Sequence, residues 1–250
     1  MNAAPLLRAT GIVRRFGGLT AVDGVSIDLV RGSVHAVIGT NGAGKSTLIN
    51  VLSGEQPADA GSVELAGVDV TRWSQPRRAR AGLGRTYQRS TVFQEFTVLE
   101  NCRLCAQARH ARVLGFGAAA QCTASLDDAR RALADTRLDA LADRIVATLS
   151  HGQRRQLEVA MCVATHPQVL LLDEPLAGMG AEESATMLEL LAALRDGHAI
   201  MLVEHDMDAV FRIADRITVM VNGAVIASDT PAGVRANATV QAAYLGVDEA

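Results

Sequence analysis

The residues best suited to chemistry form a glycine-rich stretch, residues 39–47, that ends in a lysine and two hydroxyl side chains. The stretch matches G-x-x-x-x-G-K-[ST], with an apolar run before it at 34–38 and a helix-like run after it at 48–52. A strand that turns through glycines into a helix points several backbone N–H groups and the positive helix end at one spot, which suits a polyphosphate. The residues expected to surround this phosphate are Gly39, Asn41, Gly42, Ala43, Gly44, Lys45, Ser46 and Thr47.

The use of lysine singles out Lys45. Of the 24 Lys and Arg residues, 23 are Arg and only Lys45 is Lys. A chain that otherwise uses Arg for positive charge has kept a compact ammonium where it would reach the β- and γ-phosphates. The hydroxyl of Ser46 is expected to bind Mg²⁺. A chance match of a glycine-rich turn does not account for this placement.

Two acids follow a continuous aliphatic run. Residues 169–172 predict a strand buried on both faces, and Asp173 and Glu174 come directly after it. Parallel strands place ligands at their carboxyl ends, beside the phosphate-binding turn of the same sheet. Asp173 then suits Mg²⁺, directly or through water, and Glu174 suits the polarisation of an attacking water. The alternative is a pair of exposed turn residues.

Three further positions leave alternatives open. Ser150 opens a helix-like run, where it is either a plain N-cap or a phosphate contact. His205 follows the strand-like run 200–203, as a structural residue or as a sensor of a γ-phosphate. Phe16 precedes the glycine-rich stretch and either stacks on an adenine ring or joins the core.

The composition is that of a globular protein. The 250 residues are 49% hydrophobic and 20% charged, and the net charge of -3 gives no reason to expect nucleic acid as a partner. The apolar runs are too short to cross a bilayer. Residues 1–16 lack the apolar block of a signal peptide, so the expected compartment is the cytosol.

Other elements must position these residues. Strand-like runs lie at 6–13, 22–29, 62–65, 68–70, 200–203, 217–221 and 225–227, and helix-like runs at 150–165, 182–194 and 240–245, with a short helix opening at Pro231. Asn222-Gly223 predicts a type I′ hairpin turn. Arg77, Arg78 and Arg80 are expected to form a solvated helix face.

Between residues 97 and 149 the pattern becomes helical. Thr97 and Glu100 match a capping box, and the glycines at 115–117 predict a break. We therefore expect an α/β nucleotide-binding core with a β subdomain, made of residues 1–88 and 166–250, and a helical subdomain at 89–165 inserted into it.

These motifs arrive in the order of an ATP-binding cassette (ABC) protein, and the resemblance covers residues 6–246. The chain is most similar to the branched-chain amino acid, urea and amide importer branch, on four motifs: Phe16 to Gly18, Arg85 to Gln88, Val203 to Met207 and Ala243 to Gly246. The resemblance implies a P-loop NTPase with a mixed, RecA-like core, an antiparallel β subdomain and the inserted helical subdomain.

The resemblance also implies roles for single residues. Phe16 would stack on the adenine of ATP, and Gln88 would touch Mg²⁺ and the attacking water. The family has a signature stretch, which here is Leu149 to Gln153. Its residues Ser150, Gly152 and Gln153 would bind the ATP held by an opposite, head-to-tail subunit. Glu174 would be the general base and His205 would hold the γ-phosphate.

Three positions depart from the family pattern. Thr40 stands where the glycine-rich loop usually has Pro, and His151 replaces the first Gly of the signature. Gly180 stands where the loop after Glu174 generally ends in Asp, which puts cross-talk between two sites through that carboxylate in doubt.

The expected function is that of the ATPase subunit of an importer, peripheral on the inner face of the cell membrane. Its partners would be a second ABC subunit, in a head-to-tail homodimer or heterodimer, permease subunits that dock on Phe93 and Phe96, and indirectly an extracytoplasmic solute-binding protein. The cargo would be branched-chain amino acids or a related small polar solute. The alternatives are an ABC ATPase of a non-transport cytosolic assembly system and a P-loop small-molecule kinase.

Overall fold

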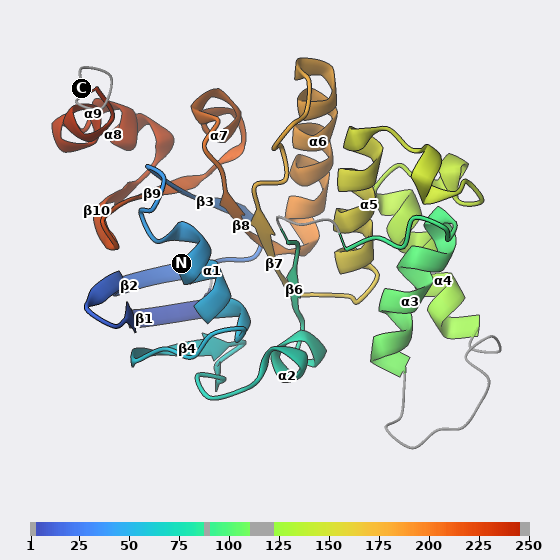
Figure 1. Cartoon of the computed structure of the whole chain (residues 1–250), viewed down its shortest axis with the longest axis horizontal. Helices are drawn as coiled ribbons and strands as arrows, with labels where there is room; N and C mark the ends of the chain where they lie inside the picture. Colours follow the sequence, from blue (N-terminus) through green and yellow to red (C-terminus); the bar gives the residue numbers. More distant parts are fainter. Residues whose placement is uncertain (1–3, 88–90, 111–122, 246–250) are drawn as a thin grey trace.

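The computed structural model describes residues 4–87, 91–110 and 123–245. Two sheets and a group of helices make up this part of the chain, with the helices α3 (Val98–His110), α4 (Thr123–Asp135) and α5 (His151–Val163) to one side in Figure 1. No helix in the described ranges is both long and apolar enough to cross a membrane.

The larger sheet has six strands in the order β10-β9-β3-β8-β7-β6. Its strands are β3 (Ser33–Gly39), β6 (Leu83–Arg85), β7 (Val169–Asp173), β8 (Ala199–Val203), β9 (Arg216–Val221) and β10 (Ala224–Asp229). All neighbours pair in parallel except β9 and β10. Every residue of β7 and β8 is buried, as expected for central parallel strands. The register pairs Asp173 with Val203, which aligns the carboxyl ends of these two strands.

The smaller sheet is antiparallel, in the order β2-β1-β4-β5. Its strands are β1 (Leu7–Phe16), β2 (Leu19–Leu29), β4 (Ala60–Leu65) and β5 (Val68–Asp69). Helix α1 (Lys45–Ser53) packs against strands of both sheets through Leu48, Ile49 and Leu52. The helix that follows the glycine-rich turn is therefore fixed by two layers of apolar contact.

Helix α2 (Gln75–Arg80) packs against α1 and β6. The helices on the side of the core are α3 (Val98–His110), α4 (Thr123–Asp135) and α5 (His151–Val163), with single 3₁₀ turns at Asp139–Leu141 and Val146–Thr148. The capping box that opens α3 is present, since Glu100 N donates to Thr97 Oγ1 and Thr97 N donates to Glu100 Oε2. The buried cluster of these helices continues into β7 and β8. The boundaries at 89 and 165 therefore stay a prediction, and the expected break at 115–117 lies outside the described residues.

The carboxyl-terminal part consists of α6 (Ala181–Leu194), a 3₁₀ turn (Arg195–Gly197), α7 (Met207–Ile213), α8 (Pro231–Ala236) and α9 (Ala238–Leu245). Asn222 and Gly223 have φ values of 48° and 84°, so the expected type I′ turn between β9 and β10 is confirmed.

The expectation for the arginine cluster was wrong at one position. Arg78 is 2% exposed, and its guanidinium donates to the carbonyls of Val51, Leu52 and Thr71. The reason is that the last carbonyls of α1 lack partners within the helix, and a buried guanidinium satisfies two of them. A pattern of charges alone does not reveal such a neighbour.

Candidate functional site

The glycine-rich turn connects the end of β3 at Gly39 to the start of α1 at Lys45. Gly44 is the N-cap with φ 98°, and no side chain caps the helix. A Cβ at Gly44 would lie 2.1 Å from the carbonyl oxygen of Ala21, so only glycine fits there. The uncapped N–H groups at this helix end favour an anion.

A pocket of about 540 Å³ lies at this turn. Of the sequence-predicted residues, Phe16, Asn41, Gly42, Ala43, Gly44, Lys45, Ser46, Thr47 and Glu174 line it. The turn and the predicted base therefore share one cavity, although Thr47 and Glu174 are 127 positions apart in the sequence.

Lys45 is buried at the base of the turn. Its Nζ donates to the carbonyl oxygens of Gly39, at 2.7 Å, and Thr40, at 3.0 Å. Burial lowers the pKa of Lys45, and the nearby carboxylates of Glu174 and Asp173 act in the opposite direction. Two backbone carbonyls of its own turn therefore fix the position of the Lys45 ammonium.

Asp173 and Glu174 lie at the carboxyl end of β7. Asp173 is 2% exposed, and burial is the main cause that raises its pKa. Glu174 has φ 48°, a left-handed conformation that is rare for Glu, and its N–H donates to the carbonyl of Val203. This turn directs Glu174 to the pocket while Asp173 stays within the sheet.

The oxygen atoms present at the site fit Mg²⁺ as ligands. Within the described part of the chain, Asp173 Oδ1 is buried and has no hydrogen-bond partner. Such an orphaned carboxylate oxygen suits a hard cation, as does the exposed hydroxyl of Ser46 on the pocket wall. Gln88, the third predicted metal contact, lies outside the described residues.

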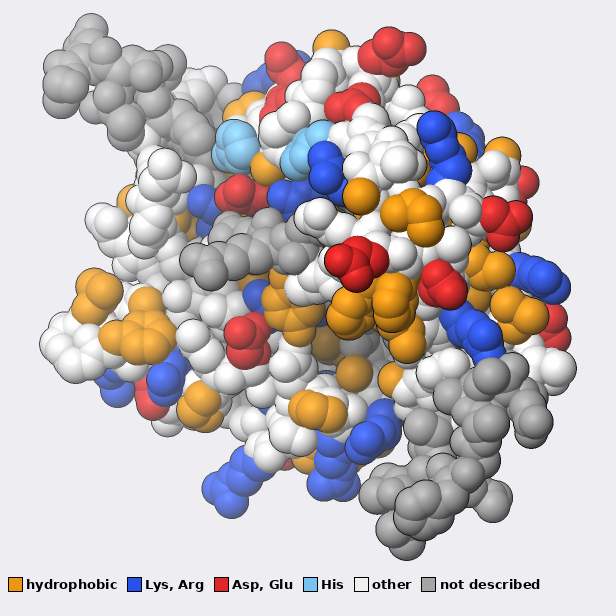
Figure 2. Space-filling model, turned by 45° about the vertical axis from the view of Figure 1, so that its right-hand side comes forward, with side chains coloured by type: hydrophobic (Ala, Val, Ile, Leu, Met, Phe, Trp, Pro, Cys, Tyr) orange, Lys and Arg blue, Asp and Glu red, His pale blue; other side chains and the backbone are white. Residues whose placement is uncertain are grey.

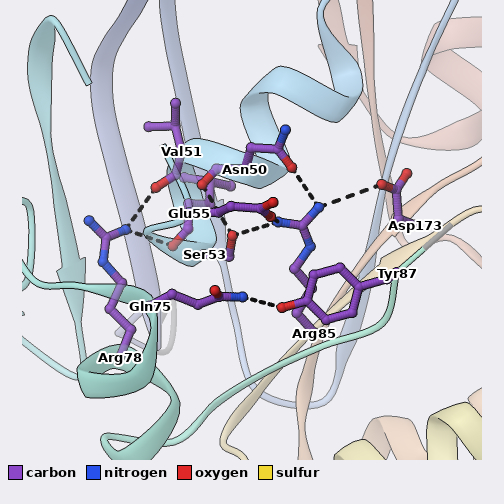
Figure 3. Close-up of polar contacts among 10 residues, drawn as sticks. Asn50, Val51, Ser53, Glu55, Gln75, Arg78, Arg85, Tyr87 and Asp173 are labelled. Carbon is purple, nitrogen blue, oxygen red and sulfur yellow. Dashed lines mark hydrogen bonds and ion pairs between the residues drawn. The ribbon is translucent and has the colours of Figure 1, made fainter. Parts of the chain in front are cut away.

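Arg85, the last residue of β6, holds the carboxyl-terminal end of α1. Its Nη1 donates to Ser53 Oγ at 2.7 Å and to Glu55 Oε2 at 2.5 Å. Its Nη2 donates to Asn50 Oδ1 at 2.5 Å. Figure 3 shows this fork at the end of α1. Since α1 carries Lys45 at its other end, Arg85 fixes the direction of the phosphate-binding helix.

The same guanidinium stands beside the acidic strand end. Its Nη2 lies 3.9 Å from Asp173 Oδ2, and its Cζ lies 4.8 Å from the ring centre of Tyr87. Gln75 in turn donates to the hydroxyl of Tyr87 (Figure 3). Arg85 therefore connects helix α1, the carboxylate of Asp173 and the segment that leads to residue 88.

Phe16 is 43% exposed and lies on the wall of the pocket. The guanidinium of Arg14 lies 4.7 Å from its ring centre. Of the two alternatives, this position favours the one in which the ring stacks on a base, because a core position would bury the ring.

The signature residues lie at the start of α5 and do not line this pocket. Gln153 N donates to Ser150 Oγ, and Ser150 N donates to Gln153 Oε1, so the helix opens with a capping box. Ser150 Oγ and Gly152 N also donate to Glu183 Oε1, at 3.0 and 3.2 Å. The structure thus separates the predicted site residues into two groups.

His205 follows β8 but is not among the residues that line the pocket. Its side chain is 62% exposed, and its Nδ1 lies 3.8 Å from Glu204 Oε2. Glu204 itself is fully buried, and its Oε1 accepts from the backbone N–H of Leu176. Burial raises the pKa of Glu204.

Sequence reasoning missed the roles of three residues around the site. The motifs include Arg85 without assigning it a contact, and they give no role to Glu183 or Glu204. Glu204 holds the backbone that follows Glu174, through Leu176. A carboxylate directly after an apolar strand-like run was the available signal for Glu204. No pattern pointed to Glu183, because its partners lie about thirty residues earlier.

The fold and the pocket define a P-loop nucleotide-binding protein with the architecture of an ATP-binding cassette. A model of the ABC transporter family matches residues 22–177, and a model described as branched-chain amino acid ATP-binding cassette transporter matches residues 224–250. The chain belongs to the ABC transporter family and is one of its ATP-binding subunits, as expected.

Relatives that match along almost the whole chain sharpen this assignment. The high-affinity branched-chain amino acid transport ATP-binding proteins BraF of Pseudomonas aeruginosa and LivG of Escherichia coli K12 are each 38% identical over 251 residues, which covers 97% of this chain and 98% of theirs. The crystal structure of the ADP conformation of MJ1267, an ATP-binding cassette of an ABC transporter, is 31% identical with a TM-score of 0.85, covering 98% of this chain and 100% of that one.

Proposed function

We propose that this chain hydrolyses ATP with Mg²⁺ to energise the uptake of branched-chain amino acids, or of a related small polar solute, through a membrane permease. The observation that carries the proposal is the single pocket shared by the phosphate-binding turn and Glu174. The names of the relatives support the cargo. The chain would work peripherally on the inner face of the cell membrane, and an extracytoplasmic binding protein would select the solute.

The chain's own residues would perform hydrolysis as follows. The backbone N–H groups of the turn and the ammonium of Lys45 hold the β- and γ-phosphates, and Phe16 stacks on the adenine. Glu174 accepts a proton from the attacking water. Ser46, Asp173 and Gln88 would hold Mg²⁺, which would supply positive charge against the charge that develops on the phosphates.

A second cassette would complete the site. Ser150, Gly152 and Gln153 do not line the pocket that contains Lys45, which supports a head-to-tail arrangement in which they reach the ATP of the opposite subunit. His205 is exposed at the end of β8, where it would contact the γ-phosphate once the two subunits close.

The permease would dock on the helical side of the chain. Phe93 and Phe96 are 54% and 40% exposed, and their rings stack with centres 5.4 Å apart. Figure 2 brings this side forward and shows hydrophobic side chains gathered on it. A groove of about 200 Å³ between α2, β6, α3 and α5 includes Arg85 and Tyr87 in its lining. Exposed aromatic pairs of this kind suit a protein interface.

The test begins with Glu174→Gln. The variant should bind ATP like the parent, while ATP turnover falls by about 10²–10⁴-fold because no carboxylate accepts the proton. Equilibrium binding of a fluorescent ATP analogue and phosphate release measure the two quantities, with Glu182→Gln as the charge-matched control. Undiminished turnover would refute the assignment of the base.

The cargo is tested separately. Co-purification from membranes should recover a permease, and deletion of the chain should abolish uptake of radiolabelled leucine or a related solute by whole cells. Co-purification with a soluble assembly partner alone would favour the non-transport alternative. A phosphoryl acceptor that raises ADP production would favour the kinase.

A further inference from the structure

Glu183 occupies the donors of the signature stretch. Its Oε1 accepts from the hydroxyl of Ser150 at 3.0 Å and from the backbone N–H of Gly152 at 3.2 Å. Gly152 is buried, and a Cβ there would lie 2.6 Å from the Glu183 carboxyl group. The absence of a side chain at residue 152 lets the carboxylate approach the start of α5 closely.

The proposed function gives these same donors to the γ-phosphate, and the role inferred for Glu183 rests on that function. A carboxylate at the amino-terminal end of a 13-residue helix is stabilised by the helix dipole and by charge-assisted hydrogen bonds. A phosphate is stabilised by the same features. The hydroxyl of Ser150 has one hydrogen to donate and the backbone of Gly152 has one, so the two anions compete.

The position of Glu183 allows it to leave. It lies in the first turn of α6, three residues after Gly180, which ends the loop that follows Glu174. Its side chain is only partly buried, so water can hydrate the carboxylate once its hydrogen bonds to Ser150 and Gly152 break. The loop between Glu174 and α6 also contacts the signature, since a ring nitrogen of His151 lies 3.0 Å from the carbonyl oxygen of Ala177.

We propose that Glu183 is a built-in competitor of the γ-phosphate, which holds the signature stretch in a phosphate-free state and raises the ATP concentration needed for two cassettes to close. ATP presented by the opposite subunit displaces the carboxylate. After hydrolysis and phosphate release the carboxylate returns to Ser150 and Gly152, which favours reopening. Glu183 therefore sets the ATP concentration at which the dimer closes, without contacting the reacting atoms.

The test uses the full chain carrying Glu174→Gln, which slows hydrolysis so that closure can be measured at equilibrium. Sedimentation gives the ATP concentration at half-maximal dimerisation. Adding Glu183→Ala should lower this concentration by about tenfold, because the phosphate no longer has to displace an anion. Glu183→Gln keeps an oxygen acceptor but loses the charge, so it should give a smaller decrease.

Glu182→Ala is the matched control. Glu182 precedes Glu183 in the same helical turn and carries the same charge, but it is exposed. Its removal should leave the midpoint unchanged, which separates competition at the signature from a general reduction of negative charge. Circular dichroism verifies folding, and Glu183→Gln carries the test if Glu183→Ala does not fold.

An unchanged or higher midpoint in folded Glu183 variants would overturn the inference while the parent still dimerises with ATP. A parent that binds ATP but dimerises neither with itself nor with a second cassette that co-purifies with it would instead overturn the composite site of the proposed function, and the inference with it. A Glu182→Ala midpoint that falls as far as that of Glu183→Ala would also contradict the inference.

Discussion

Two helix ends in this molecule are proposed to contact phosphate, and they differ in the groups that satisfy their N–H donors. The start of α1 follows a glycine with positive φ, has no side-chain cap, and lies in a pocket with Lys45 and Glu174. The start of α5 has a full capping box and also binds the carboxylate of Glu183. The first end is open to a ligand, whereas the second is already satisfied by its own chain. This difference supports the proposal that one chain binds ATP at the first end and that a second cassette completes the site.

The largest expected effect separates the first helix end from the second. Lys45→Ala should weaken ATP binding at least about 100-fold, because a charge-assisted contact to two phosphates is lost. Lys45→Arg should also bind poorly, since the ammonium is held in a buried position by the carbonyls of Gly39 and Thr40. Calorimetry measures both, with the exposed Arg137→Gln as control. Normal affinity of Lys45→Ala would end the phosphate assignment.

Ser150→Ala probes the other helix end. ATP binding by the single chain should match the parent, whereas turnover at high chain concentration should fall by about tenfold or more. The lost N-cap should also cost about 1 kcal/mol of unfolding free energy. Thr97→Ala removes the equivalent cap of α3 and should lower stability similarly with turnover unchanged. If Ser150→Ala weakened binding as much as Lys45→Ala, the two ends would not be distinct.

Arg85→Gln tests what aims the first helix end. The side chain is 7% exposed and supports Asn50, Ser53 and Glu55, so its loss should lower the unfolding free energy by about 2 kcal/mol. Because Glu55 is partly exposed, the expected loss of unfolding free energy is smaller than that for a fully buried ion pair. Arg85→Lys should recover only part of this unfolding free energy, because an ammonium lacks the branched donors of a guanidinium. Arg137→Gln, in an exposed pair with Glu189, is the control for urea denaturation.

The smallest expected effect concerns β3, the strand that leads into the turn. His35 is buried there, its Nδ1 facing the carbonyl of Asp28 and its Nε2 facing the hydroxyl of Thr218, and burial lowers its pKa to about 4. In the unfolded chain His35 binds a proton near pH 6.5, whereas in the folded chain it stays neutral down to about pH 4. The free energy of unfolding is therefore full above pH 6.5 and falls as the pH drops toward 4.

His35 should therefore contribute a loss of about 2 kcal/mol between pH 7 and pH 5. His35→Gln should flatten the stability profile over this interval, and the parent serves as the reference. Urea denaturation at several pH values measures both profiles. Equal slopes in the parent and His35→Gln would contradict this explanation of the buried ring.

The two helix ends also show what a sequence predicts well. The turn at 39–47 and the acids after β7 were found because each is contiguous and has a fixed local geometry. Most strands and helices followed from periodicity, but the three-residue strand β6 was not predicted because it is too short to show a period. The contacts of Arg78, Arg85 and Glu183 were not found, because their partners come from other elements and depend on how α1, α5 and α6 pack. Whether Phe16 faced a pocket or the core was likewise decided by packing.

The most direct measurement is a crystal structure of Glu174→Gln with ATP and Mg²⁺. We expect a two-fold dimer in which the γ-phosphate lies between Lys45 of one chain and the partner subunit's Ser150, with Glu183 displaced from the signature in both chains. A γ-phosphate contacted by one chain alone, with Ser150 still donating to Glu183, would contradict the composite site.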